Sequence, residues 1–471
     1  MTYDSSSRIV AELTQWIDSA APGEKLPSSR SLVARFQASP VTVQKALSTL
    51  ARRGLVESRP GVGTFVRAVR SIAPPDLSWQ TAALSQREPA FTSSMAALQI
   101  ASNDVFALHS GYPDPGLLPK DLVRTALNRM ARTENSLRRA PTAGDGDLQS
   151  WFATELADGT SRHVSEPNPS DVTIIPGSQS GLASILRSVV GSGGSLVVES
   201  PTYWGLIAAA RHSGVRLIPV PSGIDGPSPD VLDEAFERSG ATAFYAQPNF
   251  ANPTGAHWSP NLRADVLDLV RSRRAFLVED DWAHDFGIDA VSQPLVADDA
   301  DGHIIYIRSL TKSVSPALRV AAVVARGPAR ERIRTVVSAE AMYVSPILQA
   351  AALDVVTRPA WRTHLRSLGR QLRTRRDSLA AALRAEAPDL RLEQVPTGGL
   401  NLWVRLPLGI DVDEFVKAAA DVNVLITGGA DWFPAEAPAG FVRLNFAGPN
   451  PAGFTEAMRR LGEALAQLQA R

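Results

Sequence analysis

The sequence predicts three parts: a small N-terminal module of helices and a hairpin, a large α/β domain, and a smaller C-terminal α+β domain. Residues 1–72 hold two short amphipathic helix patterns followed by a hairpin pattern. Residues 73–95 contain Pro74, Pro75 and Pro89 without lasting periodicity, which indicates a linker. From residue 96 to 471, apolar strand-like runs alternate with amphipathic stretches, as in a parallel-rich sheet covered by helices.

The N-terminal module has the element order of a winged helix-turn-helix. Ser39 supplies an N-cap and Pro40 a favoured first-turn residue for the second helix. Segment 55–66 then predicts a hairpin around a glycine turn. The apolar residues expected on the buried helix faces are Leu32, Val33 and Phe36 in the first helix and Val43, Ala46, Leu47 and Leu50 in the second.

The charge and the surface chemistry of this module favour binding to nucleic acid. Residues 1–72 carry ten basic and five acidic side chains, a net charge of +5, whereas the remainder carries 38 basic and 43 acidic, a net charge of −5. A basic head attracts phosphates, and salt weakens that attraction. A purely structural helical module is the alternative. The polar face of the second helix presents Thr42, Gln44, Lys45, Ser48 and Thr49, groups suited to base edges and phosphates.

Two segments, 26–30 (Leu-Pro-Ser-Ser-Arg) and 61–66 (Gly-Val-Gly-Thr-Phe-Val), closely resemble the GntR family of regulators. The resemblance implies binding to a double-stranded DNA operator. Family members often begin the recognition helix with Ser-Arg, whereas this chain has Ser39 and Pro40. The operator preference of the family therefore does not carry over directly to this chain. The residues expected at the DNA are Arg30, Ser39, Thr42, Gln44, Lys45, Gly61 and Gly63.

In the α/β domain, β-rich runs at 195–198, 216–220, 241–246, 275–278, 304–307 and 320–325 predict the strands of the sheet. A further strand is expected at 171–176 and a helix from Leu182, with the glycine-rich turn 177–181 between them. Backbone N–H groups in such a turn suit an anion. After about residue 340, helix-rich sequence with strands at 401–404 and 442–446 predicts the smaller domain, about 340–471.

Lys312 is the most informative single residue. It follows an apolar run at 303–307, has hydroxyl residues on both sides, and precedes Arg319 by seven positions. A lysine at a strand end suits Schiff-base formation with an aldehyde cofactor, and an arginine nearby suits the cofactor's phosphate.

The order of these motifs resembles the type I aminotransferase-like fold of pyridoxal phosphate proteins over most of residues 96–471. The resemblance implies that Lys312 forms the Schiff base, that Asp280 pairs with the pyridine nitrogen, and that Asn252 binds the phenolic oxygen. Arg443 matches the arginine that holds a substrate carboxylate. The cofactor-binding residues expected are Ser178, Gln179, Tyr203 (stacked on the ring), Asn252, Asp280, Ser309, Lys312 and Arg319.

Two positions depart from the family pattern. Trp282 stands where related regulators have tyrosine, and an indole donates one hydrogen bond but cannot accept one or titrate like a phenol. Ala140 stands where such proteins have a tyrosine that reaches the phosphate across a dimer. We therefore expect cofactor binding with impaired or altered turnover.

The composition of the chain excludes several classes of site. The 471 residues include no cysteine, which excludes disulfides and thiolate chemistry, and the seven histidines have no metal-ligand spacing, so no metal site is expected. Of these histidines, His284 lies near Asp280 and is a candidate for lining the cofactor site, but a structural or surface role is expected for it. The chain has no apolar run of about 20 residues that could span a membrane, and we expect a cytoplasmic protein.

Taken together, the two resemblances indicate the MocR subfamily of GntR regulators. They imply a homodimeric, pyridoxal phosphate-dependent transcription factor rather than an enzyme, sensing an amino compound through external aldimine formation at Lys312. Two alternatives stay open: a working pyridoxal phosphate-dependent aminotransferase, and a regulator that senses pyridoxal phosphate itself to control vitamin B6 supply.

Overall fold

The computed structural model describes residues 5–67, 97–102, 104–157 and 166–470, together with the single positions 80 and 83. It divides into two compact units, residues 1–90 and 91–471. We call them the head and, after the role that the sequence predicts for it, the sensor. Except for positions 80 and 83, the predicted linker 73–95 lies outside the described residues.

The head has the predicted helix, turn, helix and hairpin, preceded by one more helix. Ser39 caps the third helix by accepting a hydrogen bond from the Thr42 amide, with Pro40 in the first turn. All four apolar residues predicted for the inner face of that helix are buried. The additional helix α1 adds Ile9 and Leu13 to the same core. The elements are α1 (Ser5–Ser19), α2 (Ser29–Phe36), α3 (Pro40–Arg52), and the antiparallel strands β1 (Val56–Arg59) and β2 (Gly63–Val66).

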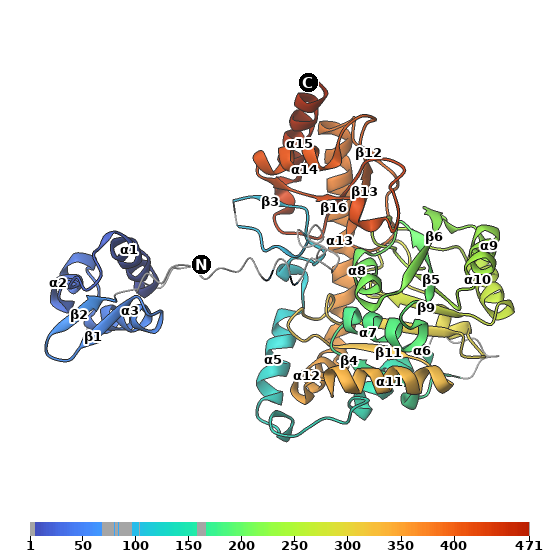
Figure 1. Ribbon diagram of the computed structural model, residues 1–471, viewed down its shortest axis with the longest axis horizontal. Coiled ribbons are helices and arrows are strands. Elements are labelled where there is room, and N and C mark those ends of the chain that lie inside the picture. Colours follow the sequence, from blue (N-terminus) through green and yellow to red (C-terminus); the bar gives the residue numbers. More distant parts are fainter. Residues whose placement is uncertain are drawn as a thin grey trace. The chain divides into compact units, whose positions relative to one another are not determined.

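An eight-stranded sheet forms the centre of the sensor (Figure 1). Its order is β4-β11-β10-β9-β8-β5-β6-β7. The strands from β10 to β6 pair in parallel, while β11 and β7 are antiparallel to their neighbours, so the predicted parallel-rich sheet is confirmed. The strands are β4 (Val172–Ile175), β5 (Ser195–Ser200), β6 (Arg216–Gly223), β7 (Gly226–Pro227), β8 (Ala243–Ala246), β9 (Phe276–Asp281), β10 (Ile304–Ser309) and β11 (Ala321–Val324).

Helices cover both faces of this sheet because its strands are apolar on both sides. One face packs on α7 (Ser178–Ile185), α8 (Trp204–Ser213) and α11 (Gly327–Ala341). The other packs on α5 (Lys120–Met130), α6 (Gly146–Ala157), α9 (Pro229–Ser239), α10 (Pro260–Ser272) and α12 (Pro346–Val356). The predicted turn 177–181 is shorter than expected: only Gly177 precedes α7, and residues 178–181 form its first turn.

The smaller part of the sensor has its own core, built on a four-stranded sheet in the order β12-β13-β16-β15. The helix α12 lies beyond residue 340 yet packs in the core of the large sheet. Conversely, β3 (Phe106–Ala107) pairs with β14 (Val424–Leu425) in the smaller part. The remaining elements are α13 (Pro359–Glu386), β12 (Arg391–Leu392), β13 (Asn401–Arg405), α14 (Val412–Asp421), β15 (Thr427–Gly428), β16 (Phe441–Asn445) and α15 (Phe454–Gln469).

Candidate functional site

The predicted cofactor residues meet at one edge of the large sheet. Ser178 follows β4, Tyr203 follows β5, Asn252 follows β8, Asp280 lies near the end of β9, and Lys312 follows β10. These strands run in the same direction, so their carboxyl ends share an edge, where open α/β sheets bind ligands. A single cavity is lined by all eight predicted cofactor residues, together with Tyr112, Gln247, Trp282 and Thr311.

Strand alternation explains why only one of three consecutive carboxylates enters this cavity. Successive side chains of β9 point to opposite faces, so Asp280 faces the cavity while Glu279 and Asp281 face away. Asp280 Oδ2 accepts hydrogen bonds from Tyr245 Oη (2.7 Å) and Gln247 Nε2 (2.8 Å). Burial raises the pKa of Asp280, and these two donors and Lys312 oppose that shift.

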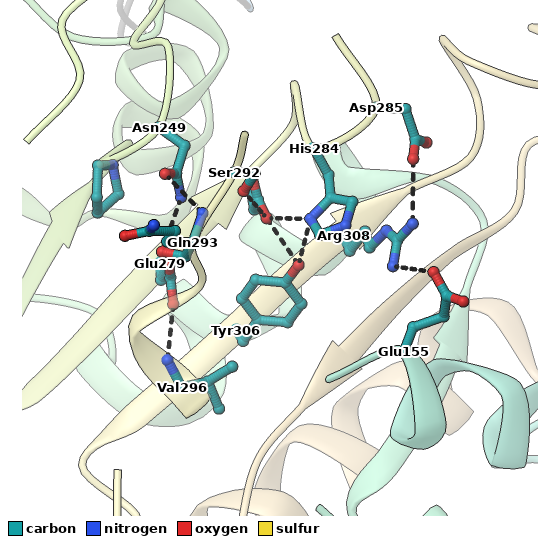
Figure 2. Close-up of polar contacts among 12 residues, drawn as sticks. Glu155, Asn249, Glu279, His284, Asp285, Ser292, Gln293, Val296, Tyr306 and Arg308 are labelled. Carbon is teal, nitrogen blue, oxygen red and sulfur yellow. Dashed lines mark hydrogen bonds and ion pairs between the residues drawn. The ribbon is translucent and has the colours of Figure 1, made fainter. Parts of the chain in front are cut away.

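The carboxylates on the other face belong to a separate polar network (Figure 2). Asp281 accepts hydrogen bonds from Tyr306 (2.8 Å) and Ser292 (2.8 and 2.9 Å) and contacts His284 Nδ1 at 2.7 Å. Burial opposes its ionisation, but His284 and the hydroxyl donors hold the pKa of Asp281 below its ordinary value. His284 thus contacts Asp281 on this face and is not among the residues that line the cavity.

Glu279 and Arg308 complete the polar network in Figure 2. The Glu279 carboxylate accepts hydrogen bonds from the amides of Leu295 (2.9 Å) and Val296 (3.1 Å). Burial, with Asp281 nearby, raises the pKa of Glu279 to about 8. Arg308 donates to Asp285 at 3.1 Å and lies 3.6 Å from Glu155. These pairs fix the strand ends beneath the cavity.

Lys312 lies against the face of an indole ring. Its Nζ is 4.1 Å from the centroid of Trp282, a cation–π distance. The Trp282 N–H donates to the Phe250 carbonyl at 3.1 Å, so that donor points away from the cavity. Burial lowers the pKa of Lys312 to about 8; Asp280 opposes the shift and Arg443 adds to it. A substantial neutral fraction near pH 8 makes this amine a nucleophile.

Two glycines make room for the cavity walls. A Cβ on Gly177 would lie 2.5 Å from the guanidinium of Arg319, which donates to the Pro176 carbonyl at 3.1 Å. A Cβ on Gly205 would lie 2.4 Å from the ring of Tyr203. Glycine at these positions lets Arg319 approach the start of α7 and lets the Tyr203 ring pack on the first turn of α8.

Arg443 lies behind Asn252 rather than in the cavity lining. It donates to Asn252 Oδ1 (3.3 Å) and the His109 carbonyl (2.8 Å) and stacks on Trp432. Burial lowers the pKa of Arg443 to about 10, so it stays charged at neutral pH. Trp432 also donates to Asn252 Oδ1, which leaves the Asn252 amide nitrogen as the group that can donate into the cavity.

Several buried polar atoms around the cavity lack a hydrogen-bond partner among the described residues. They include Asp280 Oδ1, Ser178 Oγ and Thr311 Oγ1. Buried polar atoms are nearly always hydrogen-bonded, so these three fit a polar ligand. A free carboxylate oxygen suits a protonated ring nitrogen, and two hydroxyls beside Arg319 suit a phosphate. The donor set therefore fits a phosphorylated pyridine aldehyde held next to Lys312.

The DNA-binding candidates lie on the surface of the head. Arg30, Gln44 and Lys45 are exposed on α2 and α3, and Gly61 and Gly63 lie at the hairpin turn and on β2. Ser39 and Thr42 bond to each other at the start of α3. The pattern missed Val41, which is 78% exposed beside Pro40. An exposed methyl-bearing residue in the first turn of a recognition helix suits the methyl group of thymine.

Two family models match the chain. Aminotransferase class I and II matches residues 104–461, three quarters of the sequence. The chain belongs to that family. The head matches the model of bacterial regulatory proteins, gntR family, over residues 5–66.

Relatives of this aminotransferase class I and II protein include regulators that match along nearly their whole length. The probable rhizopine catabolism regulatory protein MocR of Rhizobium meliloti is 26% identical, with 94% of this chain and 90% of the relative covered. The uncharacterized HTH-type transcriptional regulator YisV of Bacillus subtilis is 28% identical, with 87% and 85% covered. The fusion of the two domains matches the MocR subfamily of GntR regulators.

Among solved structures, the sensor resembles LysN, the alpha-aminoadipate aminotransferase of Thermus thermophilus, in complex with N-(5'-phosphopyridoxyl)-L-leucine. The TM-score is 0.75 at 28% identity, with 84% of this chain and all of that chain covered. With the family match, this assigns pyridoxal 5'-phosphate as the cofactor of the aminotransferase-like sensor.

Some residues around the cavity were absent from the predicted site. Gln247 and Thr311 lie within or beside motifs that the sequence singled out, but nothing in their spacing indicates a role. Tyr112 and Tyr245 are brought in only by folding. In the described part of the chain, no cluster of histidine and acidic residues could hold a metal ion, and no described helix is long and apolar enough to cross a membrane.

Proposed function

We propose that this protein is a DNA-binding transcriptional regulator that senses a small amino compound at Lys312. The observation that carries the proposal is the set of unpartnered atoms Asp280 Oδ1, Ser178 Oγ and Thr311 Oγ1 around a lysine whose pKa is lowered to about 8. The GntR-type head supplies the DNA-binding half.

In this proposal the cofactor supplies an electrophilic aldehyde carbon and an electron-withdrawing ring. Asp280 Oδ1 accepts from the ring nitrogen, and Tyr245 and Gln247 fix the carboxylate by holding its other oxygen. Ser178, Thr311, Ser309 and Arg319 would hold the phosphate, and Tyr203 would cover the ring. Lys312 lines the same cavity and would supply the amine that reacts with the aldehyde.

The effector would be a primary amine with a carboxylate. A neutral amine would take the place of Lys312 on the cofactor, and Trp282, whose ring lies under Lys312 Nζ, would stabilise the protonated form of the released lysine. Arg443 is the charged group positioned to attract the carboxylate, with its guanidinium already oriented by Asn252 and His109. The effector would thus exchange one set of contacts around Asn252 for another, giving the sensor two states of different geometry.

Helix-turn-helix regulators bind the two half-sites of an operator as dimers, so we infer a homodimer. The effector acts if the two sensor states hold the paired heads differently. Arg30, Gln44 and Lys45 would contact DNA from the exposed side of α2 and α3, while Val41 would contact a base edge.

The test combines absorption spectra with DNA binding. Purified wild-type protein should show the visible band of lysine-linked cofactor, and Lys312→Ala should lack it, while Lys417→Ala, an exposed lysine on α14, should retain it. A panel of amino acids is then titrated. A sensor responds to one compound with a lasting spectral change and altered affinity for its promoter DNA. Wild-type protein without the band, or a band unaffected by Lys312→Ala, would contradict the proposal.

A working aminotransferase is the second candidate, and the lowered pKa of Lys312 favours it, because a lysine that titrates near pH 8 can carry a proton between substrate and solvent. The same titration separates the two. In an aminotransferase the amino acid removes the lysine-linked band, a keto acid restores it, and the cycle repeats with product accumulation.

A further inference from the structure

The first part of α13 is strongly basic. Between residues 359 and 376 this helix contains six arginines and no acidic residue. The last two of these arginines point inward: Arg375 donates to the Gly448 carbonyl at 2.6 Å, and buried Arg376 pairs with Asp289. Arg362, Arg366 and Arg370, in contrast, are exposed to solvent. We call these three residues the arginine ridge.

The spacing of the ridge puts its charges on one face. Positions i, i+4 and i+8 lie one above another along a helix, about 6 Å apart in rise. The arginines at its two ends differ from it because they have acidic partners. Arg358 pairs with Asp354 at 3.2 Å, and Arg373 pairs with Asp289 at 2.8 Å.

Within the described residues, the ridge has no acidic partner, since none of the ion pairs there involves its three arginines. Like charges at i and i+4 destabilise a helix by about 0.2–0.5 kcal/mol per pair, so the fold gains nothing from this arrangement. The residues beyond position 72 carry a net charge of −5, so a stripe of one sign is not a reflection of bulk composition.

We infer that the arginine ridge contacts the phosphate backbone of the DNA that the head binds. Guanidinium groups match phosphate oxygens in a two-pronged geometry, and three on one face make a phosphate-tracking surface. The inference rests on DNA binding by the head.

Covalent linkage brings the two surfaces to the same DNA. Thirty peptide units join residues 67 and 97, so these points are never more than roughly 100 Å apart. A duplex of about 30 base pairs covers that distance. DNA held by the head is therefore present at high effective concentration around the sensor, which carries the ridge.

The experiment measures DNA affinity of the full-length, cofactor-loaded protein against salt. The probe is a mixed-sequence duplex of about 60 base pairs, roughly 200 Å long, titrated between about 50 and 200 mM KCl. The ridge variant is R362Q/R366Q/R370Q. The matched control is R332Q/R384Q/R391Q, which removes the same charge from exposed arginines elsewhere on the sensor. A head variant, R30Q/K45Q, reports the contribution of the head.

The ridge variant should bind more weakly than wild type, with the slope of log affinity against log salt shallower by about 2 to 3, because each phosphate contact contributes about 0.9. The control variant should keep the wild-type slope. The midpoint temperature of thermal unfolding of the ridge variant should not be lower than that of wild type, because the substitutions remove like-charge repulsion.

Equal slopes for the ridge and control variants would overturn the inference while leaving DNA binding by the head intact. Unchanged DNA affinity with a changed oligomeric state on gel filtration would also overturn it, by making the ridge an interface between copies of the chain. A wild-type protein that fails to bind the duplex would instead overturn the DNA-binding function itself.

Discussion

The head and the sensor reach their functions by opposite routes. The head builds its core and its exposed DNA-binding candidates from one continuous segment of residues 5–67, with helix caps and a hairpin that are local in sequence. The sensor assembles its cavity from residues spread between positions 112 and 319, most of them at or just after the ends of β8, β9 and β10 or at the start of α7. Local pattern therefore specifies the head, whereas the sensor site depends on long-range register.

If the two units fold independently, a substitution that destabilises the core of the head should leave cofactor binding by the sensor intact. Leu50 is completely buried in α3, so Leu50→Ala should destabilise the head by about 2–5 kcal/mol. DNA binding should be lost while the cofactor band persists, measured by fluorescence anisotropy and absorption on the same sample. Gln15→Ala, at an exposed position of α1, serves as the control. A lost cofactor band in Leu50→Ala would mean that the units fold together.

The reverse experiment disturbs the sensor alone. Asp280→Asn keeps the size of the side chain but removes the charge facing the ring nitrogen. Losing a charge-assisted hydrogen bond of about 1.5–3 kcal/mol should weaken cofactor retention roughly 10- to 100-fold. Equilibrium dialysis of cofactor measures this effect, with Asp413→Asn, exposed on α14, as the matched control. DNA affinity without effector should stay unchanged.

A third measurement tests the lowered pKa of Lys312 in the sensor. Burial lowers the pKa of Lys312 from 10.5 to about 8, and only the neutral amine attacks an aldehyde. The rate of cofactor uptake by the apo-protein should therefore rise with pH and level off above a midpoint near 8. Stopped-flow absorption from about pH 6 to about pH 10 records it. Asp280→Asn should move the midpoint lower, because the Asp280 charge favours protonated Lys312. A midpoint near that of a free lysine would contradict the lowered pKa.

The smallest effect is a local one in the head. Ser39→Ala removes the N-cap of α3 and should cost about 1 kcal/mol of head stability. Hydrogen exchange of the backbone amides of α3, resolved by peptide mass spectrometry, measures this loss within the head. Ser48→Ala, exposed in the middle of the same helix, should change stability by less than about 0.5 kcal/mol. Equal losses in both variants would exclude a capping role.

The sequence predicted much of both regions. In the head, the Ser39 cap and the buried face of α3 were predicted correctly because both depend on spacing within one helix. Helix α1 was missed, although Ile9, Leu13 and Ile17 recur at helical spacing and are buried. In the sensor, the strands were predicted from apolar runs, and the eight cofactor candidates lie around one cavity. Their individual roles stay predictions.

The two departures from the family pattern took different physical forms. Trp282 uses its N–H on the Phe250 carbonyl and presents its ring to Lys312, a contact that residue identity alone could not reveal. Ala140 lies instead at a surface hollow with Tyr343 and Met342, away from the lining of the cofactor cavity within this chain.

The sequence by itself determined helices α2 and α3, where α3 begins, most strands of the large sheet, and which lysine and carboxylate types are available for chemistry, because backbone geometry and side-chain periodicity act over a few residues. Tertiary structure alone decided that Asp280 keeps one oxygen free while Tyr245 and Gln247 hold the other, and that Arg443 lies behind Asn252. Those outcomes depend on sheet register and on which buried polar groups satisfy one another, and both are set by residues far apart in the chain.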